Sequence, residues 1–167
     1  EDNHVFGKLE YQKFPDSFWG IGPYTPDWAE ERYERERLRW RNGLLRRVYR
    51  PLYVGIYSEV MYYTGEYPDP NGTFARTVVP GEEGGFTAGV GPMLTVDSRD
   101  NVVSSRSGTL LSVTWLGFGP FVGSGHDFWK LQTEARHFFP VGEASALALR
   151  YYGEFQGGDV PYYHLAM

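Results

Sequence analysis

The sequence predicts an all-β protein made of antiparallel strands, and three observations support that prediction. Aromatic residues make up 17% of the 167 residues, and 21 residues are glycine, a composition that favours strands joined by turns. Apolar and polar residues alternate over long segments, as they do on a strand with one apolar face. Segments rich in proline and glycine separate these stretches and are typical of loops.

The clearest strands are predicted at 128–139 and 147–155. In the first segment the odd positions are mostly apolar, whereas the even positions carry Lys130, Gln132, Glu134 and Arg136. The second segment repeats the pattern, with leucines and aromatics on one face and Arg150, Tyr152 and Glu154 on the other. We expect Pro140 to end the first strand, because proline cannot donate to the ladder. Residues 140–143 would then form the tight turn of a hairpin.

Further alternating segments lie at 52–62, 86–97, 110–115 and, more weakly, 5–11. Pro92 argues against a central strand at its position unless a bulge accommodates it. Residues 12–30 and 64–83 are expected to be long loops, whereas 47–51 is expected to be a short turn. Long loops at one end and short turns at the other are typical of outer-membrane barrels.

Residues 27–48 fit two interpretations. Thr25-Pro26-Asp27 is typical of a helix start, and residues 30–41 are rich in helix formers. Charged residues would, however, interrupt the apolar face of such a helix. As a strand, the segment places Leu38, Trp40 and Leu44 on one face and four arginines on the other. We prefer the strand, and the helix stays open as the alternative.

Alternation alone does not separate a membrane barrel from a soluble β-sandwich, because both folds hide one face of each strand from water. Three features favour the barrel. The predicted strands approach the ~9–11 residues needed to cross a bilayer. Aromatic pairs such as Tyr62-Tyr63 and Phe138-Phe139 lie at strand ends, where interface girdles form. The polar face carries both charges, which suits a cross-strand network in a lumen.

We therefore expect an antiparallel transmembrane β-barrel of about seven meandering strands, part of a larger barrel, with residues 1–167 forming one barrel domain or a fragment of one. The charged residues expected to face its lumen are Arg35, Arg37, Arg39, Arg41, Glu59, Lys130, Glu134, Arg136, Arg150 and Glu154.

Several kinds of chemistry are not supported by the sequence. It has no cysteine and a net charge of −5, so neither thiolate chemistry nor nucleic acid binding is expected. The four histidines lack metal-ligand spacing, and the segment around Ser124 does not match the hydrolase nucleophile motif. Asp97 and Asp100 lack calcium-loop spacing and are expected to pair with Arg99 or an arginine on a neighbouring strand. We expect no enzyme activity, no cofactor and no bound metal.

Four segments resemble motifs of the BamA/TamA surface-antigen family, and they occur in the family's order. The most specific is Gly91-Pro92-Met93-Leu94-Thr95-Val96-Asp97-Ser98-Arg99-Asp100-Asn101, followed by Ser107-Gly108-Thr109-Leu110. The shorter matches lie at 14–22, 136–141 and 157–163. The residues that define the central motif are Gly91, Pro92, Asp97, Arg99, Asp100 and Gly108.

The resemblance implies a bacterial outer-membrane barrel of roughly sixteen strands that inserts or translocates other proteins without catalytic residues or a cofactor. The predicted strands are too few for that barrel, and no periplasmic domain is expected within these residues. Because an open edge is unstable in lipid, the remaining strands or another protomer would be needed for closure. The expected partners are outer-membrane lipid and either unfolded outer-membrane proteins or subunits of the assembly machinery. The alternatives are a transport or structural barrel and, from a different class, a soluble β-sandwich binding module.

Overall fold

The computed structural model describes residues 3–19, 24–66, 81, 84–142 and 145–165. Within them the chain forms one seven-stranded antiparallel sheet whose strands follow each other in sequence order. The strands are β1 (Asn3–Phe18), β2 (Glu31–Tyr49), β3 (Leu52–Glu66), β4 (Gly85–Asp97), β5 (Gly108–Phe118), β6 (Phe128–Val141) and β7 (Ser145–Gly158). Three single-turn 3₁₀ helices accompany them, namely η1 (Asp27–Ala29), η2 (Pro120–Val122) and η3 (Tyr162–His164).

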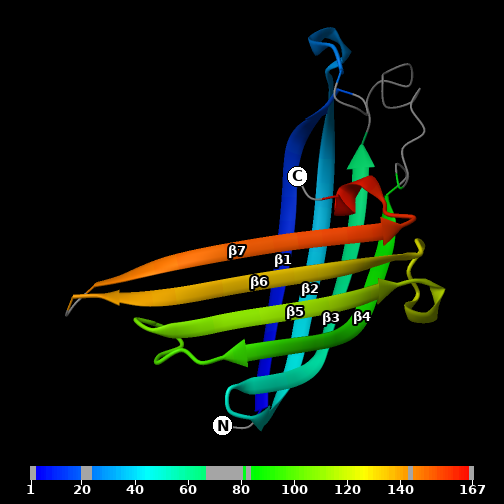
Figure 1. Cartoon of the computed structure of the whole chain (residues 1–167). Helices are drawn as coiled ribbons and strands as arrows, with labels where there is room; N and C mark the ends of the chain where they lie inside the picture. Colours follow the sequence, from blue (N-terminus) through cyan, green and yellow to red (C-terminus); the bar gives the residue numbers. More distant parts are fainter. Residues whose placement is uncertain (1–2, 20–23, 67–80, 82–83, 143–144, 166–167) are drawn as a thin grey trace.

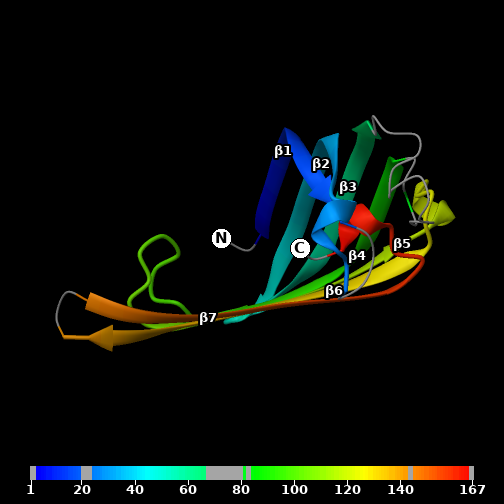
Figure 2. The same ribbon diagram turned by 90° about the horizontal axis from the view of Figure 1, so that it is seen from above.

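The sheet curls strongly about its middle, so that β1 to β3 stand at a steep angle to β5 to β7 (Figures 1 and 2). The result is about half of a barrel wall, with a concave and a convex face. The outer strands β1 and β7 each pair with one neighbour only. η3, which follows β7, lies inside the curve (Figure 2). This single curled sheet confirms the predicted antiparallel barrel architecture.

Two glycines allow the close strand contacts that accompany this curl. A Cβ atom on Gly55 would overlap the carbonyl oxygen of Leu44, and one on Gly91 would overlap the carbonyl oxygen of Trp115. Only glycine permits such an approach of one backbone to another. Beside Gly91, Pro92 lies inside β4, and the β4–β5 ladder has no pair at these two positions. The proline is therefore accommodated in a central strand by an interrupted ladder.

The segment 27–48 is a strand, as preferred, except for the single turn of η1 at its start. β2 then continues without interruption from Glu31 to Tyr49. Its burial alternates with a period of two over much of its length, which a helix would not produce.

Several predicted boundaries were wrong. Residues 64–66, expected to begin the loop 64–83, instead end β3 and pair with residues 34–36 of β2. Residues 12–18 were expected to open a long loop, but they extend β1, because each pairs with a residue of β2. Pro140 does not end its strand; it pairs with Ala146, and the strand continues to Val141. Gly142, with φ of 63°, begins the turn instead. Most of the loop predicted at 64–83, including 67–80, lies outside the described residues, as do residues 20–22 of the first motif.

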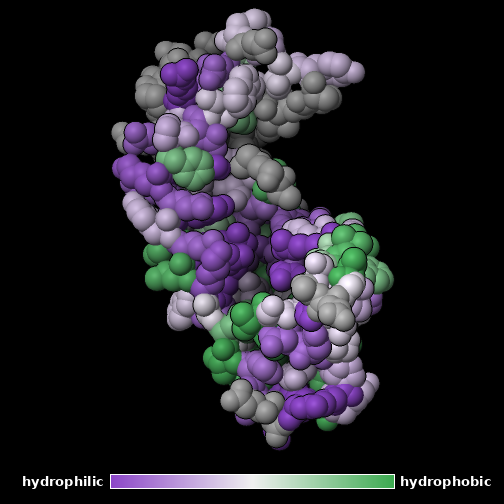
Figure 3. All heavy atoms as spheres, turned by 90° about the vertical axis from the view of Figure 1, so that its left-hand side faces the viewer, coloured by the Kyte–Doolittle hydropathy of each residue, from purple (hydrophilic) through white to green (hydrophobic). Residues whose placement is uncertain are grey.

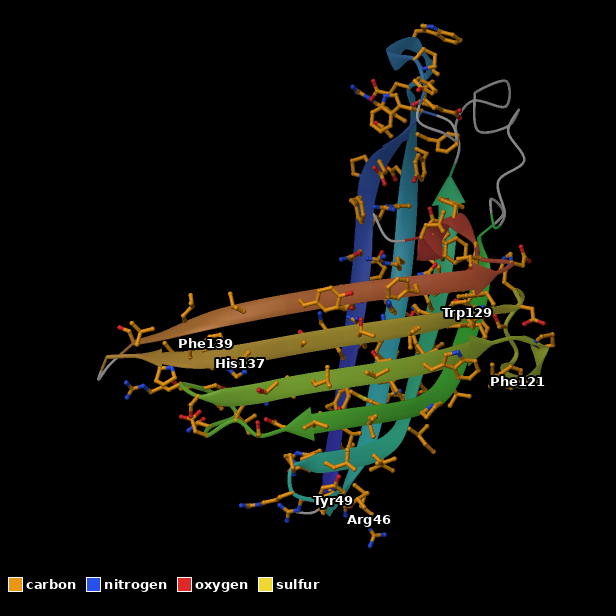
Figure 4. All side chains as sticks on the ribbon, in the orientation of Figure 1. Arg46, Tyr49, Phe121, Trp129, His137 and Phe139 are labelled. Carbon is orange, nitrogen blue, oxygen red and sulfur yellow. The ribbon has the colours of Figure 1, made fainter. Side chains whose placement is uncertain are left out.

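The convex face carries the apolar side chains. Strand pairing places Leu131, Leu147 and Leu149 together on it, and the last two are 53% and 56% exposed. Trp129 lies near one end of the sheet and Phe139 near the other (Figure 4). Ten residues of strand at ~3.3 Å each, tilted by ~40°, span about 25 Å, the height of the apolar band of an outer-membrane barrel.

This exposed band overturns the soluble β-sandwich alternative, in which the same leucines would pack between two sheets. Polar groups at the edge of the band are partnered. His137 Nδ1 lies 2.7 Å from Thr109 Oγ1, and its ring contacts the Phe139 ring edge-on with centroids 4.2 Å apart. In the part of the chain that the structure describes, no helix is long and apolar enough to span a membrane.

Candidate functional site

The concave face is ionic, and its main feature is a row of four arginines on β2. They occupy every second position, so they share one face of the strand. Each has a partner on a neighbouring strand: Arg35 pairs with Asp16 at 2.9 Å, Arg37 with Gln12, Arg39 with Glu59 at 2.9 Å, and Arg41 with Glu10. Figure 3 shows hydrophilic side chains lining the hollow of the molecule.

The most deeply buried part of this face is an ion pair between Glu59 on β3 and Lys130 on β6. Their side chains are 0% and 1% exposed, and Lys130 Nζ lies 2.7 Å from Glu59 Oε1. Arg39 binds the second oxygen of the same carboxylate. The Lys130 ammonium also lies 5.2 Å from the centre of the Phe118 ring. The cluster therefore joins three strands from the two halves of the curled sheet.

η3 covers this cluster from inside the curve. His164 Nε2 lies 2.8 Å from Thr87 Oγ1, and the Tyr163 ring stacks on Tyr63 with centroids 4.4 Å apart. Burial, together with the nearby Lys130 charge, lowers the pKa of His164 to about 3, so its imidazole is neutral. Burial raises the pKa of Tyr163 to about 12, which keeps its hydroxyl protonated. That hydroxyl is buried and has no hydrogen-bond partner among the described residues.

A second ionic group lies toward the turn between β6 and β7. Glu134 on β6 accepts hydrogen bonds from Arg136 at 2.8 Å and from Arg150 on β7 at 2.9 Å. Both arginines are more exposed than the buried cluster, at 38% and 61%. Glu154, farther along β7, accepts hydrogen bonds from Gln132 and Tyr152, each 2.8 Å long.

All ten residues predicted to face a lumen thus lie on the concave face, because strand pairing gives them one orientation. Six of them form the arginine row and its buried cluster, three form the group around Glu134, and Glu154 lines the cavity beside the row. Thr87, Tyr163 and His164 belong to the same site but were not predicted as part of it. No local pattern marks them, since only the return of η3 over the sheet brings them there.

A cavity of about 350 Å³ lies between the arginine row and the opposite wall of the curve. Glu154 and Tyr152 line it from β7, and Tyr163 lines it from η3. The hollow therefore has four guanidinium groups on one wall, and on the other the Glu154 carboxylate, which accepts hydrogen bonds from Gln132 and Tyr152.

The central motif residues organise the connection between β4 and β5. The Asp97 carboxylate accepts two hydrogen bonds from the Arg99 guanidinium, at 2.8 and 2.7 Å, which confirms the expected pairing. A Cβ atom on Gly108, whose φ is 103°, would clash with the Ser98 backbone. In this motif the charged residues therefore shape a turn.

Asp100 holds the rest of that connection. One of its oxygens accepts the backbone N–H groups of Asn101, Arg106 and Ser107, at 3.0 to 3.2 Å. These hydrogen bonds, that of Arg106 first, lower the pKa of Asp100.

The geometry around Ser124 does not resemble a nucleophile and its base. Ser124 Oγ donates to the backbone oxygen of His126 at 2.9 Å, and His126 Nδ1 lies 3.1 Å from Asp159. Among the described residues no group of three or more histidine, aspartate or glutamate side chains is arranged to hold a metal ion.

An apolar convex face, an ionic hollow and a curled antiparallel meander together define the wall of a membrane β-barrel. A family model described as the Omp85 superfamily domain matches residues 30–165. The chain belongs to the Omp85 superfamily, whose barrels are typical of the bacterial outer membrane and serve in general to insert or translocate proteins. No curated protein and no solved structure matches the chain.

Proposed function

We propose that this chain forms part of a barrel of the BamA/TamA type, which inserts or translocates other proteins at the outer membrane without catalytic residues or a cofactor. The observation that carries this proposal is the open, curled sheet: it has an apolar outer face, an ionic inner face and, within the described residues, two edges that pair with no further strand. Such a wall acts on other chains through its shape and its edges.

The two edges constrain what completes the barrel. Seven antiparallel strands in sequence order make β1 and β7 run in the same direction. An antiparallel sheet that pairs with both edges must therefore contain an odd number of strands. A second copy of this sheet would instead pair β7 with β1 in parallel, a slightly less stable arrangement.

The test is reconstitution of the full-length protein in vesicles of outer-membrane lipid. A urea-unfolded outer-membrane protein is diluted into these vesicles, and its folding is followed by heat-modifiable gel mobility. We expect faster folding than in vesicles that contain an unrelated barrel of similar size. Equal rates in the two vesicle populations would contradict the proposal.

The transport alternative makes a different prediction, because it needs a wide water-filled passage. η3 and the Glu59–Lys130 cluster occupy the inside of the curve, and this argues against a wide pore. Planar-bilayer recordings would separate the two functions: steady conductance without acceleration of folding would favour the transport barrel.

A further inference from the structure

The arginine row carries more positive charge than its surroundings neutralise. The carboxylates beside it are shared between cations: Glu10 contacts both Arg41 and Lys8, and Glu59 contacts both Arg39 and Lys130. Arg37 has a neutral partner, the Gln12 amide. With Glu154 on the opposite wall, the four arginines and Lys130 face four carboxylates, Asp16, Glu10, Glu59 and Glu154. The hollow therefore keeps an excess of one positive charge in a protein whose net charge is −5.

The residues that line this cavity also carry buried hydrogen-bond donors. The Nε atoms of Arg35, Arg39 and Arg41 and the hydroxyl of Tyr163 are buried without a hydrogen-bond partner among the described residues. All four residues line the cavity beside the row. These atoms have almost no exposed surface, so a ligand in the hollow would meet only the exposed parts of the guanidinium side chains, which are 14%, 19% and 23% exposed for Arg35, Arg39 and Arg41.

The spacing of the row indicates the shape of that ligand. Arginines two residues apart on a strand lie ~6.8 Å from each other, so the four span about 20 Å. Side chains at alternate positions of an extended polypeptide have the same repeat. A single small anion would contact one or two of the four arginines, whereas an extended chain could lie along all of them.

We propose that the arginine row binds an extended polypeptide segment with carboxylates at alternate residues, and that Arg37 receives the first of these carboxylates. This inference rests on the proposed function, because it names the kind of segment that an insertion or translocation barrel would hold in its hollow. Arg37 is the anchor because, among the described residues, its partner is the neutral Gln12 amide and not a carboxylate.

The experiment measures fluorescence anisotropy of dye-labelled twelve-residue peptides with the full-length protein in detergent. One peptide alternates glutamate with threonine, a second has the same composition with its glutamates in one block, and a third alternates lysine with threonine. We expect the alternating acidic peptide to bind at least several-fold more tightly than the block peptide, and the lysine peptide not to bind.

The Arg37→Gln variant should weaken binding of the alternating peptide about tenfold, the loss typical of one charge-assisted hydrogen bond. Arg37→Lys should restore part of it, which separates loss of charge from damage to the fold. Arg136→Gln is the matched control, because Arg136 lies on the same face, pairs with Glu134 and does not line the cavity. It should change the affinity less than twofold. Heat-modifiable mobility verifies that each variant is folded.

Equal binding of the two acidic peptides, or competition by millimolar inorganic phosphate alone, would overturn the inference in favour of a site for small anions. Unchanged affinity of Arg37→Gln would also overturn it. The vesicle folding assay reports the proposed function separately. Accelerated folding without peptide binding would refute only this inference, whereas peptide binding without accelerated folding would refute the proposed function.

Discussion

Replacement of Glu59 by glutamine tests whether the buried ionic cluster holds the two halves of the sheet together. The amide keeps the size of the side chain but leaves the Lys130 ammonium, 1% exposed, and the Arg39 guanidinium without their shared carboxylate. Removing one partner of a buried ion pair costs about 3–5 kcal/mol, because the remaining charge stays desolvated. A typical domain has a free energy of unfolding of ~5–15 kcal/mol, so we expect a large fraction of the stability to be lost.

The assay is urea unfolding of the full-length protein in vesicles, followed by tryptophan fluorescence and gel mobility. Glu134→Gln is the matched control on the same face, since its arginine partners are 38% and 61% exposed and exposed pairs contribute only ~0–1 kcal/mol. A Glu59→Gln, Lys130→Gln double variant should be more stable than the sum of the single losses predicts. Equal losses for Glu59→Gln and Glu134→Gln, or strict additivity in the double variant, would refute the reasoning.

Three further outcomes are expected from the same unfolding assay. Acidification from pH 7 to 5 should destabilise the docked η3 by about 2 kcal/mol. The reason is that the pKa of His164 is about 3 in the folded protein, against 6.5 for an exposed histidine, so acid favours the state in which His164 is exposed and protonated. A His164→Gln variant that shows the same pH dependence would contradict this. Ala135→Arg on the convex face should lower the free energy of unfolding by ~2–4 kcal/mol, because it places a charge near the bilayer centre. Ala148→Arg on the concave face should lower it by less than ~1 kcal/mol. Similar losses for the two variants would contradict the assignment of faces. Gly91→Ala should lower the free energy of unfolding by at least ~1–3 kcal/mol, because the new Cβ atom would overlap the backbone of the neighbouring strand. Gly125→Ala should be tolerated, because its Cβ atom would make only ordinary contacts. A larger loss for Gly125→Ala than for Gly91→Ala would show that the close strand approach at Gly91 is not needed.

The strands and their two faces could be predicted from sequence because the alternation of apolar and polar side chains along a strand depends only on neighbouring residues. Once Leu38 and Trp40 lie on one face, the arginines between them must lie on the other. The same logic explains why the helix interpretation of 27–48 failed: helix-forming residue types were present, but pairing with β1 and β3 on both sides outweighs propensity.

The errors and omissions arise from tertiary pairing. Pro140 lies inside its strand because the β6–β7 ladder continues past it, and a proline is tolerated near the end of a strand. His164 was seen in the sequence only as one of four scattered histidines. Its partner Thr87 is 77 residues away, so no local pattern could join them.

The parity of the sheet links the fold to the proposed function. Bacterial outer-membrane barrels of a single chain contain an even number of strands, and seven are present in the described sheet. If the complete barrel has an even number of strands, the strands that close it must be odd in number. An odd number of closing strands is also what lets both β1 and β7 pair antiparallel. Closure by a second copy would also give an even total, but it would make two parallel seams. Membership of the Omp85 superfamily and the geometry of the two edges therefore favour the same solution: a further set of antiparallel strands, odd in number, completes the barrel around the arginine-lined hollow.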